Sequence, residues 1–263
     1  MGITAPNGLV IAIDGPSGSG KSSASKGVAR ALGLRYLDTG AMYRALTWWF
    51  MEQETGSAGL TAETGLIAAR AAEPVIEVST DPDHPWTRVN GRDVSAAIRT
   101  PEVSAQVSVV AAVPAVRRRL IAQQRAIIAA AEGIVAEGRD IGTVVAASAP
   151  LKIFLTADPL ARARRRAAEL SVSADQAGRD EASVDEAKID EIKVDEIKVD
   201  EIKVDETRAA QDRRDRLDAA QSEKASDAWL IDASELTLDE VVGEIVRLAR
   251  QIDSLACAGD KTI

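Results

Sequence analysis

A glycine-rich stretch near the amino terminus carries residues that are suited to phosphate chemistry. Gly15, Gly20, Lys21 and Ser22 fit the pattern GxxxxGK followed by Ser or Thr, in which glycines let several backbone N–H groups converge on phosphate oxygens. Lys21 would reach the β- and γ-phosphates of a nucleoside triphosphate such as ATP, and the hydroxyl of Ser22 would bind Mg²⁺. The residues expected to contact the triphosphate are Gly15, Pro16, Ser17, Gly18, Ser19, Gly20, Lys21, Ser22 and Ser23.

The residues on either side of this stretch predict the elements that would hold it. Residues 9–14 are mostly aliphatic and predict a strand, and residues 22–32 predict a helix whose positive amino-terminal end would face the phosphates. A strand, a glycine loop and a helix in this order are the setting that the motif requires. The alternative is a glycine turn that merely joins a strand to a helix, and the presence of all four fixed positions argues against it.

The rest of the chain predicts an α/β protein with an insertion. Further short apolar runs predict strands at residues 34–37, 134–136, 151–155 and 229–232. Asn90-Gly91 lies between two runs that favour strands and predicts a hairpin, and hence a small antiparallel sheet within the larger fold. Pro114 should divide the long alanine- and valine-rich segment at 104–131 into two helices.

Composition excludes several classes of function. The chain has 263 residues, 46% of them hydrophobic, which is enough for a full core. A formal net charge of −9 argues against a nucleic-acid polymer as partner. No run approaches the ~20 apolar residues that span a bilayer, so we expect no membrane segment. The single cysteine, Cys257, cannot form an internal disulfide, and we expect a cytoplasmic protein.

Downstream segments indicate which reaction the phosphate loop serves, because many unrelated proteins share such a loop. Residues 36–44 read YLDTGAMYR, and together with residues 11–23 they resemble the bacterial cytidylate (CMP) kinases, a branch of the nucleoside monophosphate (NMP) kinases. Further matching segments follow in the order of the family along nearly the whole chain: VNGRDVSAAIRTPEVS, AEGRDIGTVV, KIFLTADPLARARRR and RRDRLD. The resemblance implies a monomer that uses ATP and Mg²⁺ to phosphorylate CMP or dCMP.

The resemblance also implies a P-loop NTPase fold with a parallel central sheet, an inserted small NMP-binding domain and a lid over ATP. The expected core comprises residues 1–45, 118–160 and 207–263, the NMP-binding insertion residues 46–117, and the lid residues 161–206. The lid departs from the family because residues 184–206 repeat a pentad of the type VDEIK, whose apolar spacing matches neither a helix nor a strand. We expect this repeat to be a solvated extension, helical or disordered, without chemistry of its own.

By the same resemblance, residues from several segments would bind the acceptor nucleotide. Thr39 and Arg44 would contact CMP, with Arg44 clamping its phosphate. Ser108 and Arg117 match residues that recognise cytosine, and a hydroxyl and a guanidinium can both donate hydrogen bonds to the O2 and N3 acceptors of that base. Without the resemblance, Arg44 would be interpreted as an ordinary solvated arginine.

A second group of charged residues follows the predicted strand at 134–136. In the family, Arg139 binds the acceptor phosphate and Asp140 accepts a hydrogen bond from the cytosine amino group, while Glu137 would hold Mg²⁺ through water. The structural alternative is a charged turn after a strand. In the matching segment RRDRLD, Arg214 would bridge the phosphates being exchanged, and Asp218 would accept hydrogen bonds from the ribose. The expected catalytic residues, which act by alignment and charge neutralisation, are Lys21, Arg139 and Arg214.

Two features of the lid region leave alternatives open. Arg162 and Arg165 match the start of the ATP lid and would contact ATP, although a solvated basic face is the ordinary alternative. The family has a second arginine three residues after Asp218, whereas this chain has Gln221. Because one arginine can contribute roughly 10³ to 10⁵ in rate, a nucleotide-binding protein with weakened catalysis is one competing interpretation. A kinase of another small acceptor is the other.

Overall fold

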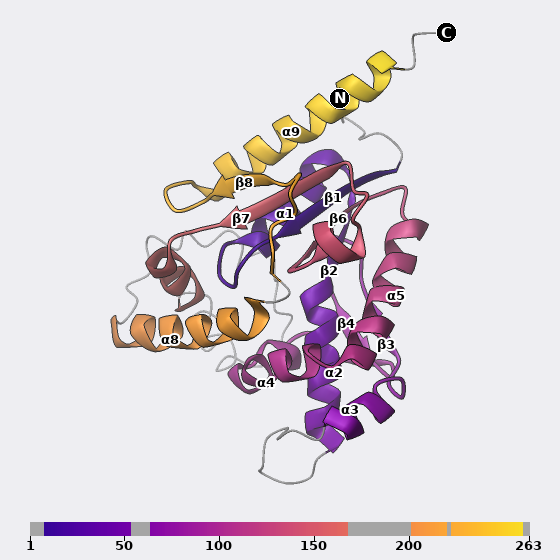
Figure 1. Cartoon of the computed structure of the whole chain (residues 1–263), viewed down its shortest axis with the longest axis vertical. Coiled ribbons are helices and arrows are strands. Elements are labelled where there is room, and N and C mark those ends of the chain that lie inside the picture. Colours follow the sequence, from indigo (N-terminus) through magenta and orange to yellow (C-terminus); the bar gives the residue numbers. More distant parts are fainter. Residues whose placement is uncertain (1–7, 54–63, 168–200, 220–221, 260–263) are drawn as a thin grey trace.

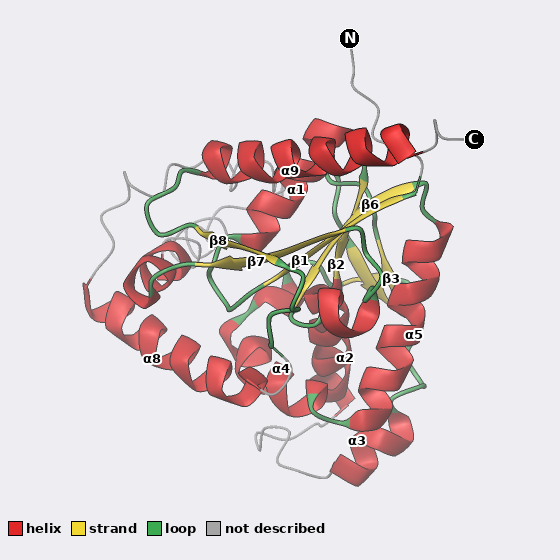
Figure 2. Ribbon diagram, turned by 45° about the horizontal axis from the view of Figure 1, so that its top comes forward, coloured by secondary structure: helices red, strands yellow, loops and turns green. Residues whose placement is uncertain are grey.

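Five parallel strands form the central sheet in a computed structural model that describes residues 8–53, 64–167, 201–219 and 222–259. Their order across the sheet is β2-β6-β1-β7-β8, and every neighbouring pair is parallel (Figure 2). The strands are β1 (Leu9–Asp14), β2 (Arg35–Asp38), β6 (Gly133–Gly138), β7 (Leu151–Thr156) and β8 (Trp229–Asp232). The predicted parallel sheet is therefore confirmed.

Helices cover both faces of this sheet, which is why its central strands are apolar on both sides (Figure 1). The helices that flank the sheet are α1 (Lys21–Leu32), α2 (Thr39–Gln53), α5 (Pro114–Ala130) and α9 (Leu238–Gly259). Ile11 and Ile13 of β1 pack with α1 and α9 in one hydrophobic cluster, whereas Ala12 packs with α2 and α5 in another. Successive residues of β1 thus point to opposite layers.

The carboxyl-terminal helix is longer than the sequence predicts. The apolar periodicity predicts a helix over residues 238–252 and a frayed tail from Asp253, whereas α9 continues to Gly259. Residues 253–258 contain neither proline nor glycine, so no residue stops the helix before Gly259.

A smaller unit is inserted between α2 and α5. Its elements are α3 (Thr64–Arg70), β3 (Ile76–Val78), β4 (Thr87–Val89), β5 (Arg92–Asp93) and α4 (Pro101–Ala111). The three strands form an antiparallel sheet in the order β3-β4-β5. Asn90 and Gly91 join β4 to β5 with φ angles of 51° and 79°, as the predicted hairpin requires. The predicted division at Pro114 is also confirmed, because α5 begins at that residue.

Two helical segments overlap the two ends of the expected lid, residues 161–206. Residues 159–167 are helical, and Asp158 caps them because its Oδ1 accepts the N–H of Leu160 at 2.7 Å. The second segment is α8 (Glu201–Asp218), whose first residues are the last ones of the pentad repeat. The remainder of the repeat, residues 184–200, and Gln221 lie outside the described residues.

The five strands of the central sheet end at one common edge because they are parallel. β1 leads into the glycine loop, β2 leads into α2, and β6 leads into Arg139 and Asp140. Open α/β sheets bind their ligands at this edge. None of the helices in the described ranges combines the length and the apolar character that crossing a membrane requires.

Candidate active site

The glycine loop between β1 and α1 has positive φ angles, which favour glycine, at Gly15, Gly18 and Gly20. Gly15 has a φ of 151°, and a Cβ added there would lie 2.0 Å from the carbonyl oxygen of Leu155. Gly20, with a φ of 86°, caps the start of α1. The Nζ of Lys21 donates a hydrogen bond to the carbonyl oxygen of Pro16 at 2.6 Å, so this side chain lies across the loop. An ammonium beside a helix amino terminus is suited to a polyphosphate.

Lys21 lies in a region of crowded positive charge. Burial, followed by the charge of Arg139 and then that of Arg214, lowers the pKa of the Lys21 ammonium to about 7, although Glu137 and Asp14 oppose this shift. The charged form of the ammonium is therefore less favourable here than in water. An anion in the loop would restore it, because an opposite charge stabilises a buried ammonium.

Glu137 is the buried carboxylate next to the loop. Its Oε2 accepts a hydrogen bond from Ser22 Oγ at 3.1 Å, and its Oε1 accepts one from Tyr36 Oη at 2.5 Å. Burial and the nearby charge of Asp38 raise the pKa of the Glu137 carboxyl, against the effect of Lys21.

The oxygens of Ser22 and Glu137 fit a magnesium ion that is bound together with a nucleotide. Carboxylate and hydroxyl oxygens are hard ligands, and Mg²⁺ commonly takes only one or two of them from the protein when phosphates supply the rest. Within the described ranges, no three His, Cys, Asp or Glu side chains form a metal site by themselves. The role of this pair as magnesium ligands stays a prediction.

Three arginines from distant segments face one region beside the loop. Arg44 comes from α2, Arg139 follows β6, and Arg214 comes from α8. Burial lowers the pKa of Arg214, and the positive charges of Arg139, Arg44 and Arg166 lower it further, although arginine stays protonated at neutral pH. Arg139 also donates from its NH1 to the carbonyl oxygen of Gly15 at 2.9 Å, directly at the loop. Guanidinium groups gathered in this way are suited to phosphate.

The carboxylate of Asp218 holds three of the predicted residues together. Its Oδ1 accepts a hydrogen bond from Ser108 Oγ at 2.8 Å. Its Oδ2 lies 3.4 Å from Nε of Arg139 and 3.7 Å from Nε of Arg214. Asp218 therefore links the insertion, the end of β6 and α8. A single negative charge faces two guanidinium groups, so a positive field remains for a ligand.

Two residues predicted to read cytosine are also in contact with each other. Arg117 of α5 donates a hydrogen bond to Oδ2 of Asp140. Thr39 is buried, and its Oγ1 donates a hydrogen bond to the carbonyl oxygen of Glu137 at 2.7 Å. Its hydroxyl proton is thus engaged by the backbone, and only the lone pairs of its oxygen remain for a ligand.

The lid arginines lie against the glycine loop and the end of the sheet. Arg162 donates from its NH1 to the carbonyl oxygen of Ser17 at 3.1 Å and to Oδ2 of Asp215 at 2.5 Å. The N–H of Ser17 in turn donates to Oδ1 of Asp215 at 3.4 Å. Arg165 donates to the carbonyl oxygen of Ala233 at 2.7 Å. Asp215, which sequence reasoning missed, therefore joins α8 to both the loop and the first lid segment.

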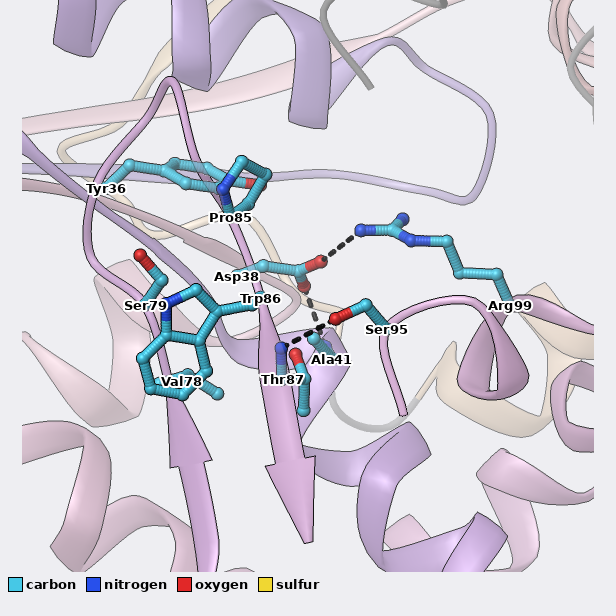
Figure 3. A pocket seen from close by; sticks show the side chains of 10 residues that line it. All are labelled: Tyr36, Asp38, Ala41, Val78, Ser79, Pro85, Trp86, Thr87, Ser95 and Arg99. Carbon is cyan, nitrogen blue, oxygen red and sulfur yellow. Dashed lines mark hydrogen bonds and ion pairs between the residues drawn. The ribbon is translucent and has the colours of Figure 1, made fainter. Parts of the chain in front are cut away.

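Asp38 and Arg99 are further site residues that sequence reasoning missed. Oδ2 of Asp38 lies 3.0 Å from NH2 of Arg44 and 3.9 Å from NH2 of Arg99. Asp38 and Arg99 border a hollow of about 20 Å³ between β2 and the small sheet (Figure 3). A space of this size holds about one water molecule and does not accommodate a nucleotide. The position of Asp38 just before Thr39, within the matching segment 36–44, was a signal that could have revealed it.

Comparison with known proteins shows the family to which the chain belongs. The family model described as cytidylate kinase matches residues 11–251. A protein from Streptomyces griseus named cytidylate kinase is 46% identical over 250 residues, which cover 93% of this chain and 94% of that protein. A cytidylate kinase from Mycobacterium leprae is 41% identical over 249 residues, or 92% of this chain and 96% of its relative. The chain therefore belongs to the cytidylate kinase family, the phosphotransferases that its loop and its gathered arginines suggest.

Proposed function

We propose that the protein transfers the γ-phosphoryl group of ATP to CMP or dCMP, yielding ADP and CDP or dCDP. The observation that carries this proposal is the gathering of Lys21, Arg44, Arg139 and Arg214 in one region beside the glycine loop. Two anionic nucleotides would bind to these cations in addition to the carboxylates of Asp38, Asp218 and Glu137. The family to which the chain belongs supports the same reaction.

On the donor side, the loop backbone and Lys21 bind the β- and γ-phosphates of ATP. Ser22, and Glu137 through water, would hold Mg²⁺, which would neutralise part of the charge on these phosphates when bound. Arg162 and Arg165 belong to the lid that closes over ATP. Exclusion of water by this lid protects the γ-phosphoryl group from hydrolysis.

On the acceptor side, Arg44 clamps the phosphate of CMP and Thr39 contacts the same nucleotide. Asp140 accepts a hydrogen bond from the cytosine amino group. Arg117 and Ser108 donate to the O2 and N3 acceptors, for which the Ser108 hydroxyl turns away from Asp218. Asp218 accepts hydrogen bonds from the ribose. In domain terms, we assign acceptor binding to residues 46–117, the lid to 161–206, and the core to 1–45, 118–160 and 207–263.

The transfer itself needs no general base, because the attacking acceptor oxygen belongs to an ionised phosphate. This oxygen forms a bond to the γ-phosphorus as the bond from that phosphorus to the β–γ bridging oxygen breaks, and ADP leaves with the electron pair. Lys21, Arg139 and Arg214 stabilise the charge on the group in transit. Catalysis therefore rests on alignment and on fixed positive charge.

The reaction is tested by measuring ADP formation in a coupled assay with CMP, dCMP, UMP, AMP and shikimate as acceptors. We expect kcat/KM for CMP to exceed that for UMP by roughly 100-fold, since a site built to hydrogen-bond one base rejects another. Lys21→Met should abolish turnover and serves as the blank. Comparable rates with AMP or shikimate would overturn the assignment. If calorimetry shows binding of ATP and CMP but no ADP forms, the result would instead favour a nucleotide-binding protein with weakened catalysis, the alternative suggested by Gln221.

Arg214→Met should lower kcat with CMP by roughly 10³, because it removes a fixed positive charge from the group being transferred. Arg213→Met is the matched control, since Arg213 is the preceding residue on α8 but is exposed. We expect its kcat to stay at the level of the natural protein. Equal kcat values for the two variants, with equal melting temperatures, would contradict the role given to Arg214.

Asp140→Asn should reduce kcat/KM for CMP by roughly 100-fold and narrow the preference for CMP over UMP. The amide oxygen accepts a weaker hydrogen bond from the cytosine amino group than a carboxylate does, and the amide nitrogen can donate to O4 of uracil. Asp83→Asn controls for loss of one acidic charge, because Asp83 is exposed and pairs with Arg30. An unchanged ratio of CMP to UMP in Asp140→Asn would remove Asp140 from base recognition.

A further inference from the structure

Tyr36 forms a short chain of hydrogen bonds that ends at the start of α1. Its Oη donates to Oε1 of Glu137 at 2.5 Å, and Oε2 of Glu137 accepts from Ser22 Oγ at 3.1 Å. Tyr36 and Glu137 are 2% and 3% exposed, so water does not replace the contact between them, whereas Ser22 is exposed. We propose that Tyr36 is a positioning residue for the metal–nucleotide site, acting through Glu137 on Ser22. This inference rests on the proposed function.

The strand register explains how a residue so far away in sequence reaches Glu137. β2 pairs in parallel with β6, and Tyr36 lies opposite Val135. Glu137 is two residues further along β6, so its side chain points to the same face of the sheet as Val135 and Tyr36. Tyr36 and Val135 belong to the hydrophobic cluster that includes residues of α1, which begins with Lys21 and Ser22. The three members of the chain therefore meet in one layer.

The direction of each hydrogen bond determines what the chain does. A carboxylate has two oxygens, and Tyr36 occupies one of them with its only proton. The second oxygen accepts a hydrogen bond from Ser22, which leaves the lone pairs of the Ser22 hydroxyl free for a cation. Tyr36 thus fixes the rotation of the Glu137 carboxylate, and this rotation fixes the orientation of Ser22. Groups that orient metal-binding residues in this way change metal affinity without touching the metal.

A purely structural role for Tyr36 is the competing explanation, because the ring is buried in the hydrophobic cluster around β1 and α1. The two explanations differ in what the hydroxyl contributes. Tyr36→Phe keeps the buried ring and removes only the donor to Glu137. Tyr43→Phe is the matched control, since Tyr43 is the only other tyrosine and forms no hydrogen bond to Glu137 among those of the described residues.

The test measures Mn²⁺ binding to the complex of the full chain with ADP, by the loss of the electron paramagnetic resonance signal of free Mn²⁺. We expect Tyr36→Phe to weaken Mn²⁺ binding by roughly tenfold, as loss of an orienting partner does in other metal sites. ADP binding in EDTA should be unchanged. Tyr43→Phe should bind Mn²⁺ as the natural protein does. An unchanged Mn²⁺ affinity in Tyr36→Phe, or an equal loss of ADP affinity in EDTA, would overturn the proposal.

A second measurement leaves the hydroxyl in place and therefore does not depend on the folding of Tyr36→Phe. In the protein labelled with 3-fluorotyrosine, the Tyr36 signal is the one that remains in Tyr43→Phe. This ¹⁹F resonance should shift when Mg²⁺ is added to the ADP complex, and an invariant resonance would count against a link to the metal. Neither measurement requires CMP or turnover, so failure of the proposed kinase reaction and failure of this inference are distinguishable.

Discussion

The structure depends on the crowding of buried positive charges at the carboxyl edge of the sheet. Arg139 and Arg214 share the carboxylate of Asp218, and both lower the pKa of Lys21 in addition to its burial. Like charges held this close are unfavourable unless an anion lies between them. Asp218, Glu137 and Asp14 offset part of this repulsion, and a phosphate-rich ligand would offset more of it, as transition-state stabilisation by fixed cations requires.

The fold meets this constraint by bringing distant segments to one edge and then locking them there. Asp14, the last residue of β1, accepts the N–H of Ile141 at 2.8 Å and that of Gly142 at 2.7 Å. These bonds hold the turn that follows Arg139 and Asp140, and so the end of β6 is tied to the strand that enters the glycine loop. Asp218 and Asp215 perform the corresponding task for α8. Asp218, which the sequence predicts to bind the ribose, thus also positions arginines. Asp215, which sequence reasoning missed, does the same.

Much of the fold and part of the site could be predicted because their signals are local. The glycine loop, the apolar runs of the strands and Asn90-Gly91 each encode a backbone conformation within a few residues. The hydrogen bond from Ser108 to Asp218 joins residues 110 positions apart, and that from Tyr36 to Glu137 joins residues 101 positions apart. No local sequence pattern therefore predicts either bond. The ion pair between Arg162 and Asp215 depends in the same way on how two helices pack. Family resemblance named the arginines, and it named Asp218 and Asp140 only as ligand-binding residues, but it did not name Asp215 or Asp38, which also hold arginines in place.

The most direct test of the central claim is the binding of a single ligand that occupies both nucleotide positions at once. Adenosine and cytidine joined by five phosphates should bind to the natural chain with a stoichiometry of one in a calorimetric titration. We expect this ligand to bind at least roughly 100-fold more tightly than ATP, because a linked second group binds without a further loss of translational freedom. Binding no tighter than that of ATP would contradict the account, since the gathered arginines would then not face the glycine loop as one site.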